Sequence, residues 1–261
     1  MPVTPRLHFD EDMARARAML ESADLDDRIP EGVKADMLRC SWMLGVGALD
    51  AYFSDAYAAL LACTLIALRR QPNHRLTGSP IGLPDAIAAT PLPASIHFRK
   101  YQARDNWRWR MAARELIEKQ NYLNVDRICS VLNQYVRPSR KVLKGVLADW
   151  LQHPDANMTL FSVSRSAYGT ASLSEKKTHR AESTKKLRDR MDRIIGRRHD
   201  CIHNCDRPKM ALKAISAGTT RFVLRDIEFF VHRCDEHMDV EFPAFLMDLG
   251  FSKTTWAHLT F

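Results

Sequence analysis

Strand signals are almost absent from this sequence of 261 residues. Runs that alternate apolar and polar residues are rare, whereas apolar residues at helical spacing are common. The sequence also lacks a P-loop, a GxGxxG motif and an HExxH motif, so nucleotide hydrolysis and metalloprotease chemistry have no support. It contains no internal repeat. We therefore predict an all-α fold, with 46% hydrophobic residues to supply its core.

Cysteine pairs are lacking too. The sequence contains six cysteines but no CxxC pair, and a chain of this length does not need a disulfide framework. The candidate metal ligands are Cys201, His203, Cys205, His232, Cys234 and His237. Their spacing fits no zinc pattern that we can name. We expect reduced thiols, no metal site and no cofactor.

No apolar run is long enough to span a bilayer. The longest uncharged stretch, 56–68, falls short of the ~20 residues that a spanning helix needs. The start of the sequence carries early acidic side chains and lacks the unbroken apolar segment of a secretory signal. The sequence therefore predicts a cytoplasmic protein without a membrane partner.

Basic residues are in excess. Lys and Arg number 39 against 31 Asp and Glu, which gives a formal charge of +8. Clustered Lys and Arg gain free energy when they displace counterions from phosphates, so a polyanionic partner is favoured. Nucleic acid is the first candidate and an acidic membrane surface the second.

The expected organisation is one large helical domain with two flanking segments. We predict an N-terminal helical arm over 1–33, a domain over 34–240 and a C-terminal tail over 241–261 that packs on the domain. A proline-rich connection over 71–97 interrupts the domain. Apolar spacing predicts further helices over 33–69, 96–119, 124–135, 139–152, 175–204 and 221–238, with a loop over 162–174.

The helix over 175–204 carries a charge within its apolar stripe. At about 100° per residue, one face holds Leu187, Met191, Ile194, Ile195 and Ile202. Arg198 falls in the middle of that face. Burying a guanidinium costs several kcal/mol unless it is paired. Arg198 therefore requires either a buried carboxylate or a site that opens at an interface.

His203 lies five residues after Arg198, about 140° further round the helix. Asn204 and Pro208 indicate that the helix ends there. Unpaired carbonyls at a helix C-terminus favour an imidazolium, and histidine is suited to proton transfer near neutral pH. Arg198 and His203 fit half of a composite cleft better than a self-contained pair.

These residues resemble the HEPN superfamily, whose hallmark is an arginine followed after four to six residues by histidine, often with a polar residue directly after the arginine. The match here is Arg198, polar His199 and His203 in RRHDCIHNCD. The upstream segment ALDAYFSDAYAALL, residues 48–61, is similar to the first core helix of HEPN nucleases, in particular the RiboL-PSP-HEPN group. The resemblance covers 34–240, but only these two segments are specific.

The resemblance implies a bundle of four or five core helices, with additional helices, that forms a homodimer. It also implies metal-independent cleavage of RNA in a cleft lined by the arginine and histidine of both subunits. His203 would act as acid and base, and Arg198 would bind the phosphate while charge develops on it. RNA supplies its own 2′-OH nucleophile, so the products would be a 2′,3′-cyclic phosphate and a 5′-OH. A toxin or antiviral role, with a possible antitoxin or regulatory partner, follows from family analogy alone.

Four further residues are auxiliary candidates. The resemblance places Asp50 at the family's acidic position, where it would orient His203 or pair with the motif arginine. His199 stands where asparagine is frequent in the family. Arg197 and Asn204 are candidates for phosphate contact, although a solvated face or a helix cap explains each of them equally well.

A second region combines basic and aromatic side chains. Residues 99–114 include Arg104, Trp107, Arg108 and Arg110, a mixture that binds phosphates and stacks on bases. An amphipathic surface helix with aromatic core anchors explains the same pattern. RNA contact is the hypothesis for this segment, and the surface helix is its alternative.

Two alternatives to an enzyme stay open. The first is a catalytically inactive HEPN-like module that binds RNA or nucleotides. The second is a helical scaffold or interaction module in which Arg198 forms a buried structural ion pair.

Overall fold

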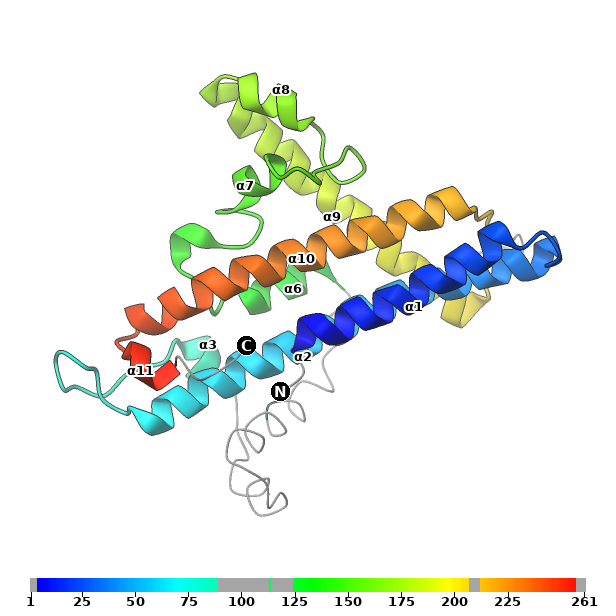
Figure 1. The fold of residues 1–261 in the computed structure, drawn as a ribbon. Helices are drawn as coiled ribbons and strands as arrows, with labels where there is room; N and C mark the ends of the chain where they lie inside the picture. Colours follow the sequence, from blue (N-terminus) through cyan, green and yellow to red (C-terminus); the bar gives the residue numbers. More distant parts are fainter. Residues whose placement is uncertain (1–3, 89–112, 114–123, 207–211, 257–261) are drawn as a thin grey trace, which may run out of the picture.

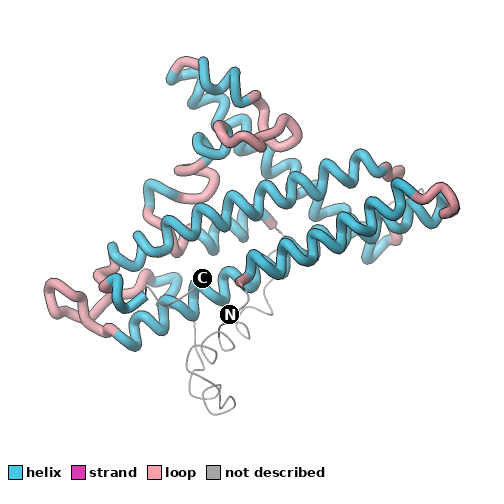
Figure 2. Tube along the Cα trace, in the orientation of Figure 1, coloured by secondary structure: helices cyan, strands magenta, loops and turns pink. Residues whose placement is uncertain are grey.

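The computed structural model describes residues 4–88, 113, 124–206 and 212–256. In these residues the regular secondary structure is helical and no β-strand forms (Figure 2). An isolated bridge joins Asn73 to Pro80 in the turn after the second helix. The predicted all-α class is confirmed.

Four long helices make up most of the described chain. They are α1 (Pro5–Leu25), α2 (Glu31–Arg70), α9 (Leu173–Asn204) and α10 (Ala217–Asp248). The shorter elements are α3 (Asp85–Ala88), α6 (Val125–Leu132), a 3₁₀ turn (Pro138–Arg140), α7 (Leu147–Leu151), α8 (Arg165–Thr170) and α11 (Lys253–Trp256). Helices are predicted at the positions of α2, α6, α9 and α10, and α10 extends beyond its predicted end at residue 238.

Helices α1, α2 and α10 run side by side, and α9 crosses them (Figure 1). α1 packs along the N-terminal part of α2, and α10 packs on both. Trp42 of α2 donates a hydrogen bond from Nε1 to the carbonyl of Ile194 in α9 at 2.9 Å. α8 and the beginning of α9 project away from the three long helices (Figure 1).

α1 is amphipathic along its whole length. Thr4 caps it by accepting a hydrogen bond from Leu7 N, and Pro5 occupies the first turn, where its missing N–H costs nothing. The buried residues recur every three or four positions, namely Phe9, Met13, Ala16, Leu20 and Ala23. This face contacts α2 and α10. The helix expected within the N-terminal arm therefore covers part of the core.

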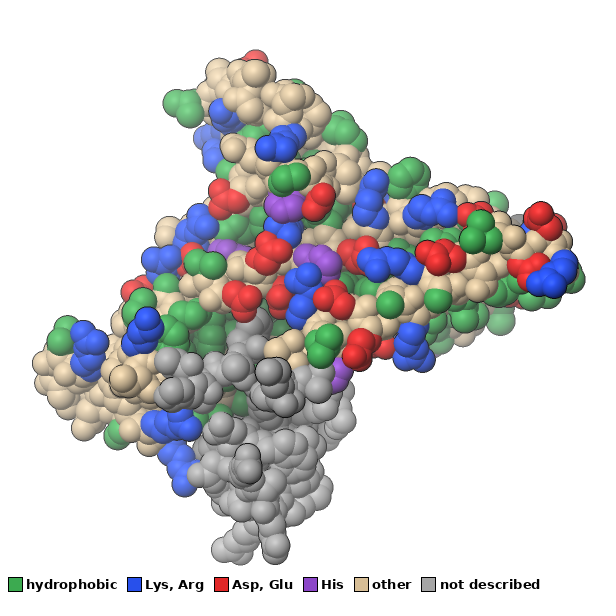
Figure 3. Space-filling model, viewed as in Figure 1, with side chains coloured by type: hydrophobic (Ala, Val, Ile, Leu, Met, Phe, Trp, Pro, Cys, Tyr) green, Lys and Arg blue, Asp and Glu red, His purple; other side chains and the backbone are tan. Residues whose placement is uncertain are grey.

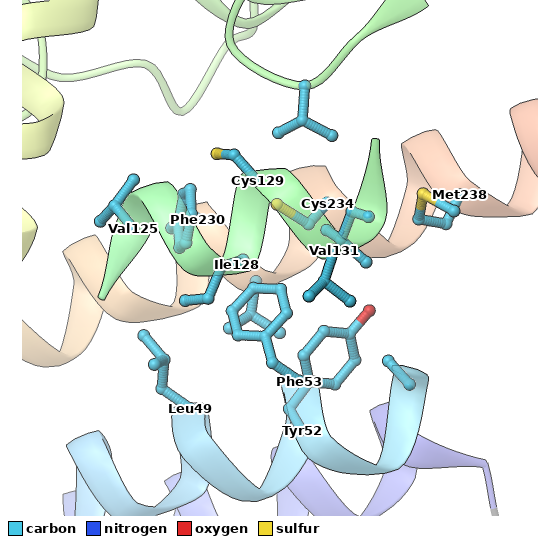
Figure 4. Close-up of a cluster of buried hydrophobic side chains, with 14 of the residues drawn as sticks. Leu49, Tyr52, Phe53, Val125, Ile128, Cys129, Val131, Phe230, Cys234 and Met238 are labelled. Atoms are coloured by element: carbon cyan, nitrogen blue, oxygen red, sulfur yellow. The ribbon is translucent and has the colours of Figure 1, made fainter. Parts of the chain in front are cut away.

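α2 is the central core helix. Leu49, Tyr52 and Phe53 of α2 point toward α6 and α10 (Figure 4), and the ring centroid of Phe53 lies 5.7 Å from that of Phe230. Among the described helices, α2 alone is long and apolar enough to cross a membrane, yet 72% of its most apolar window is buried inside the protein. The apolar residues of α2 therefore contact the neighbouring helices and form the centre of the core.

Gly45 lets α10 approach α2 closely. A Cβ at this position would lie 2.6 Å from Leu224 Cδ2 and 3.4 Å from Ile227 Cδ1. A Cβ at Gly47 would meet nothing within 4 Å. A side chain at Gly45 would therefore require the Leu224 side chain to move, whereas one at Gly47 would require no movement.

The helix predicted over 139–152 is wrong. The 3₁₀ turn, a loop and α7 occupy this range instead. Leu143 adopts a φ of 65°, which a right-handed helix does not allow, and Gly145 packs against the backbone of Ser139 and Arg140. The loop expected over 162–174 contains the short helix α8.

Some predicted elements lie partly or wholly outside the described residues. The helix predicted over 96–119 is described only at Ala113, which is buried. The proline-rich connection is described as far as residue 88, where α3 ends. Phe222 of α10 is 47% exposed and lies outside the core.

A buried carboxylate joins α10 to the 3₁₀ turn. Glu241 is 1% exposed and accepts hydrogen bonds from Arg137 Nε at 2.8 Å, Arg137 Nη2 at 2.9 Å and Arg140 Nε at 3.2 Å. The hydrogen bonds from Arg137 hold the pKa of Glu241 below its usual value, against the opposing effect of burial. Glu241 is therefore ionised in the folded protein at neutral pH.

We expect Glu241→Gln to lower the free energy of unfolding at pH 7 by about 1–3 kcal/mol, because charge-assisted hydrogen bonds are lost. A depressed carboxyl pKa stabilises the fold above the usual value of 4.5, and this contribution is lost as the pH falls through the lower, folded-state pKa. Urea denaturation over a pH series should show the variant and the wild type converging below pH 4.5. Glu21→Gln, at an exposed position, is the control. If the difference in free energy of unfolding between Glu241→Gln and the wild type stays constant with pH, Glu241 is not an ionised hydrogen-bond acceptor in the folded protein.

Candidate functional site

α9 ends one residue after His203. The helix continues to Asn204, after which Cys205 and Asp206 adopt left-handed conformations with φ of 48° and 57°. The backbone N–H groups of both residues donate to the carbonyl of Asp200, which closes the helix end. The predicted helix end is confirmed, and the motif occupies the last two turns.

The apolar face of α9 is buried only as far as Ile195. Met191 and Ile194 are fully buried, whereas Ile202 is 50% exposed. The prediction that Ile202 belongs to this face of the core is wrong, because none of the α9 residues after Ile195 is buried. Arg198 therefore continues the apolar face at the point where the helix leaves the core.

Arg198 is half-buried and lies within electrostatic reach of Asp50 on α2. Burial raises the pKa of Asp50, and the positive charge of Arg198 opposes that rise. The described residues include no direct hydrogen bond between the two side chains. The structure thus brings Asp50 near the motif arginine and leaves the guanidinium without a hydrogen-bond partner in the described part of the chain.

His199 and His203 contact each other at the same helix end. Their ring centroids lie 4.3 Å apart and the ring planes are tilted by 45°, as a spacing of four residues on a helix allows. Both residues are exposed. The continuous helix keeps Arg198 about 140° away from His203 around its axis. The structure therefore pairs the two imidazoles with each other, rather than either of them with Arg198.

Arg197 points into the protein. Its Nη2 donates to Asp206 Oδ2 at 2.7 Å and to the carbonyl of Ala214 at 3.1 Å. Its guanidinium also lies 4.8 Å from the ring centroid of Trp42, within the range of a cation–π contact. The two adjacent arginines of the motif thus have different surroundings, and of the two it is Arg198 whose guanidinium has no hydrogen-bond partner among the described residues.

Asn204 is exposed beside a surface ion pair. Lys213 Nζ lies 2.6 Å from Asp200 Oδ2 and is the largest cause of the lowered pKa of Asp200, to which a hydrogen bond with Asn204 also contributes. Asn204 therefore stabilises the helix end, the role that a cap would have. The basic and aromatic candidates Arg104, Trp107, Arg108 and Arg110 lie outside the described residues.

Two of the pockets in the described part of the chain lie away from this helix end, along the middle of α10. The larger, about 200 Å³, is lined by residues that include Arg140, His153, Arg233 and His237. The smaller, about 160 Å³, shares Arg233 and adds His232. Burial lowers the pKa of all three histidines, which favours their neutral forms. His232 and His237 are among the candidate metal ligands of the sequence, whereas no motif in the sequence marks Arg140, His153 or Arg233.

The face formed by α1 and α10 carries charges of both signs. Acidic and basic side chains alternate along it (Figure 3), and several of them pair, such as Arg6 with Asp235 and His232 with Asp10. A mixed surface attracts a polyanion less strongly than a surface of one sign. The end of α9 therefore remains the better candidate site.

That site combines a guanidinium without a hydrogen-bond partner in the described part of the chain, a nearby carboxylate and two imidazoles in contact. No group of three or more metal-ligating side chains forms in the described ranges. A guanidinium, a carboxylate and two imidazoles can bind an anion and transfer protons. Comparison with protein-family models, with curated proteins and with solved structures finds no match to this chain.

Proposed function

We propose that this protein is a metal-independent endoribonuclease of HEPN type, with His203 as acid and base and Arg198 as the ligand of the phosphate. The observation that carries the proposal is the exposed contact between His199 and His203, on the same two helical turns as Arg198, whose guanidinium has no hydrogen-bond partner among the described residues. Two imidazoles in contact can act as general base and general acid, since the neutral ring accepts a proton and the protonated ring donates one.

RNA is the substrate class that this chemistry fits. Its 2′-OH attacks the adjacent phosphate once a base removes the proton, and an acid protonates the leaving 5′ oxygen. A guanidinium stabilises the charge that develops on the phosphate oxygens. The formal charge of +8 favours binding of the polyanion.

The proposed site is shared between the two subunits of a homodimer. Within one chain, Arg198 lies toward α2 and the imidazole pair lies toward solvent. A second copy related by a two-fold axis would place its Arg198 beside the His203 of the first copy, and the reverse, in each of two sites. The proposal extends to a cytoplasmic toxin or antiviral effector held in check by an antitoxin or another regulatory partner, which rests on the family resemblance alone.

Complementation tests the shared site. Arg198→Ala and His203→Ala subunits, each inactive alone, should recover about a quarter of wild-type activity when unfolded and refolded together. Half of the dimers are then mixed and hold one intact site of two. Each variant refolded alone is the control. No recovery in the mixture would mean that arginine and histidine act within one subunit.

The activity itself is tested by incubating the purified protein with EDTA and a labelled RNA. We expect a cut RNA with 2′,3′-cyclic phosphate ends, and no cut in DNA of the same sequence or in RNA with a 2′-deoxy sugar at the cleavage position. An intact RNA would refute the proposal. RNA affinity without cleavage would instead favour an inactive binding module, and a protein without RNA affinity would favour the helical scaffold.

A further inference from the structure

The end of α9 is held in place by a buried charged cluster, which we define as Arg39, Arg197 and Asp206. Asp206 is 0% exposed and its Oδ2 accepts from Arg39 Nε at 2.9 Å and from Arg197 Nη2 at 2.7 Å. Arg39 belongs to α2 and Arg197 to α9. One carboxylate therefore joins two helices immediately after the motif.

The same two arginines also hold the chain that follows the motif. Arg39 Nη2 donates to the carbonyl of Lys213 at 3.0 Å, and Arg197 Nη2 donates to the carbonyl of Ala214 at 3.1 Å. The N–H of Lys213 donates to the carbonyl of Asp206 at 3.0 Å. These hydrogen bonds fix the chain where it leaves α9 at Asp206 and where it returns beside α9 at Lys213 and Ala214.

Asp206 also contributes to the turn that closes the helix. Its N–H donates to the carbonyl of Asp200 at 3.0 Å, and its φ of 57° is unusual for a residue other than glycine. A charged side chain held by two guanidiniums compensates for this conformation. If the carboxylate were lost, two buried guanidiniums would repel each other and the turn that carries His203 would loosen.

We propose that Asp206 is a positioning residue, which fixes the last turn of α9 against α2 so that Arg198 and the imidazole pair keep their arrangement. The expected effect of Asp206 on catalysis rests on the proposed function, whereas its effect on the position of the end of α9 does not. The chain offers a matched control in Asp226 of α10. Asp226 is also 0% exposed and accepts from an arginine of α9, Arg190 Nε, at 2.8 Å.

The experiment compares Asp206→Asn with Asp226→Asn in the full chain. The first readout is the nuclear Overhauser effect between the rings of His199 and His203, measured with labelled histidine. We expect Asp206→Asn to lose it and Asp226→Asn to keep it, although both variants lose a buried ion pair on the same helix. This readout does not depend on any enzymatic activity.

The second readout is the kinetics of RNA cleavage. We expect Asp206→Asn to lower kcat by about 100-fold with KM nearly unchanged, because a small displacement of an acid–base group affects the chemical step more than binding. Asp226→Asn should stay within about threefold of the wild type. Asp206→Glu, which restores the charge, should recover part of kcat.

The outcomes separate the two hypotheses. If the wild type leaves RNA intact, the proposed function fails, and the ring contact alone decides whether Asp206 positions the histidines. If Asp206→Asn keeps the ring contact, or if Asp226→Asn loses it to the same degree, the positioning role is overturned. If Asp206→Asn does not fold, the buried Arg39→Lys takes its place, because it keeps the charge and removes the planar group that holds Asp206 and Lys213 together.

Discussion

His203→Ala is expected to lower the rate of RNA cleavage by about 10²–10⁴-fold, the usual contribution of a general acid or base. Arg198→Ala should cost about 10²–10³-fold, because a cation that stabilises developing charge acts mainly in the transition state. Neither change should unfold the protein, since His203 is exposed and Arg198 has no hydrogen-bond partner among the described residues. The measurement is the single-turnover rate with labelled RNA in the presence of EDTA.

Control variants decide whether these losses are specific. His8→Ala removes an exposed histidine of α1 that pairs with Asp55 and lies outside the motif, so its rate should equal that of the wild type. Arg198→Lys keeps the charge but not the planar guanidinium, and should fall between the wild type and Arg198→Ala. Equal rates for the wild type, His203→Ala and Arg198→Ala would end the catalytic hypothesis.

His199 gives this prediction a second part. Because its ring contacts that of His203, it can serve as the partner acid or base. His199→Ala should then change the pH dependence of the rate, removing one limb of a bell-shaped profile, while the affinity for RNA stays close to that of the wild type. A profile of unchanged shape would return His199 to an auxiliary role.

Local signals in the sequence predicted the long helices well. The start of the motif helix, which Ser172 and Glu175 cap reciprocally, lies two residues before the predicted start at residue 175. The apolar spacing of this helix predicted its buried face through Ile195. The same spacing failed at Ile202, because periodicity gives the direction of a side chain but not where the neighbouring helices end. How far the buried face extends along α9 depends on where α9 crosses α2.

The site could be predicted only in part for a similar reason. The sequence contains two adjacent arginines, Arg197 and Arg198, and the resemblance selected the second. The reason that Arg197 is engaged elsewhere is Asp206, together with Trp42 and Arg39 from a helix more than 150 residues earlier in the chain. Contacts over that separation leave no periodic signal in the sequence.

The region 139–152 shows a different limit. Its apolar residues have helical spacing, and several of them are indeed buried, including Val142, Val146 and Leu147. The structure buries Val142 and Val146 from the loop and Leu147 from the short helix α7 instead, because the left-handed conformation of Leu143 prevents one continuous helix. The predicted continuous helix is therefore wrong, although these apolar residues are buried.

Gly145→Ala is expected to lower the free energy of unfolding by about 3 kcal/mol, at the upper end of the cost of overpacking. The added Cβ would lie 2.3 Å from the carbonyl oxygen of Ser139 and 2.7 Å from the Cα of Arg140. Both are backbone atoms, so the 3₁₀ turn must move. That movement would disturb the arginines that bind Glu241.

Gly47→Ala is the matched control, because its Cβ would meet nothing within 4 Å in the middle of α2. This change should raise stability by about 0.5–1 kcal/mol, since alanine loses less backbone entropy in a helix than glycine does. Urea denaturation of the two variants beside the wild type measures both effects. A helix over 139–152, as the apolar spacing suggests, would tolerate alanine at Gly145 and raise stability there too. Opposite signs for the two substitutions are thus the result that distinguishes the turn from the helix.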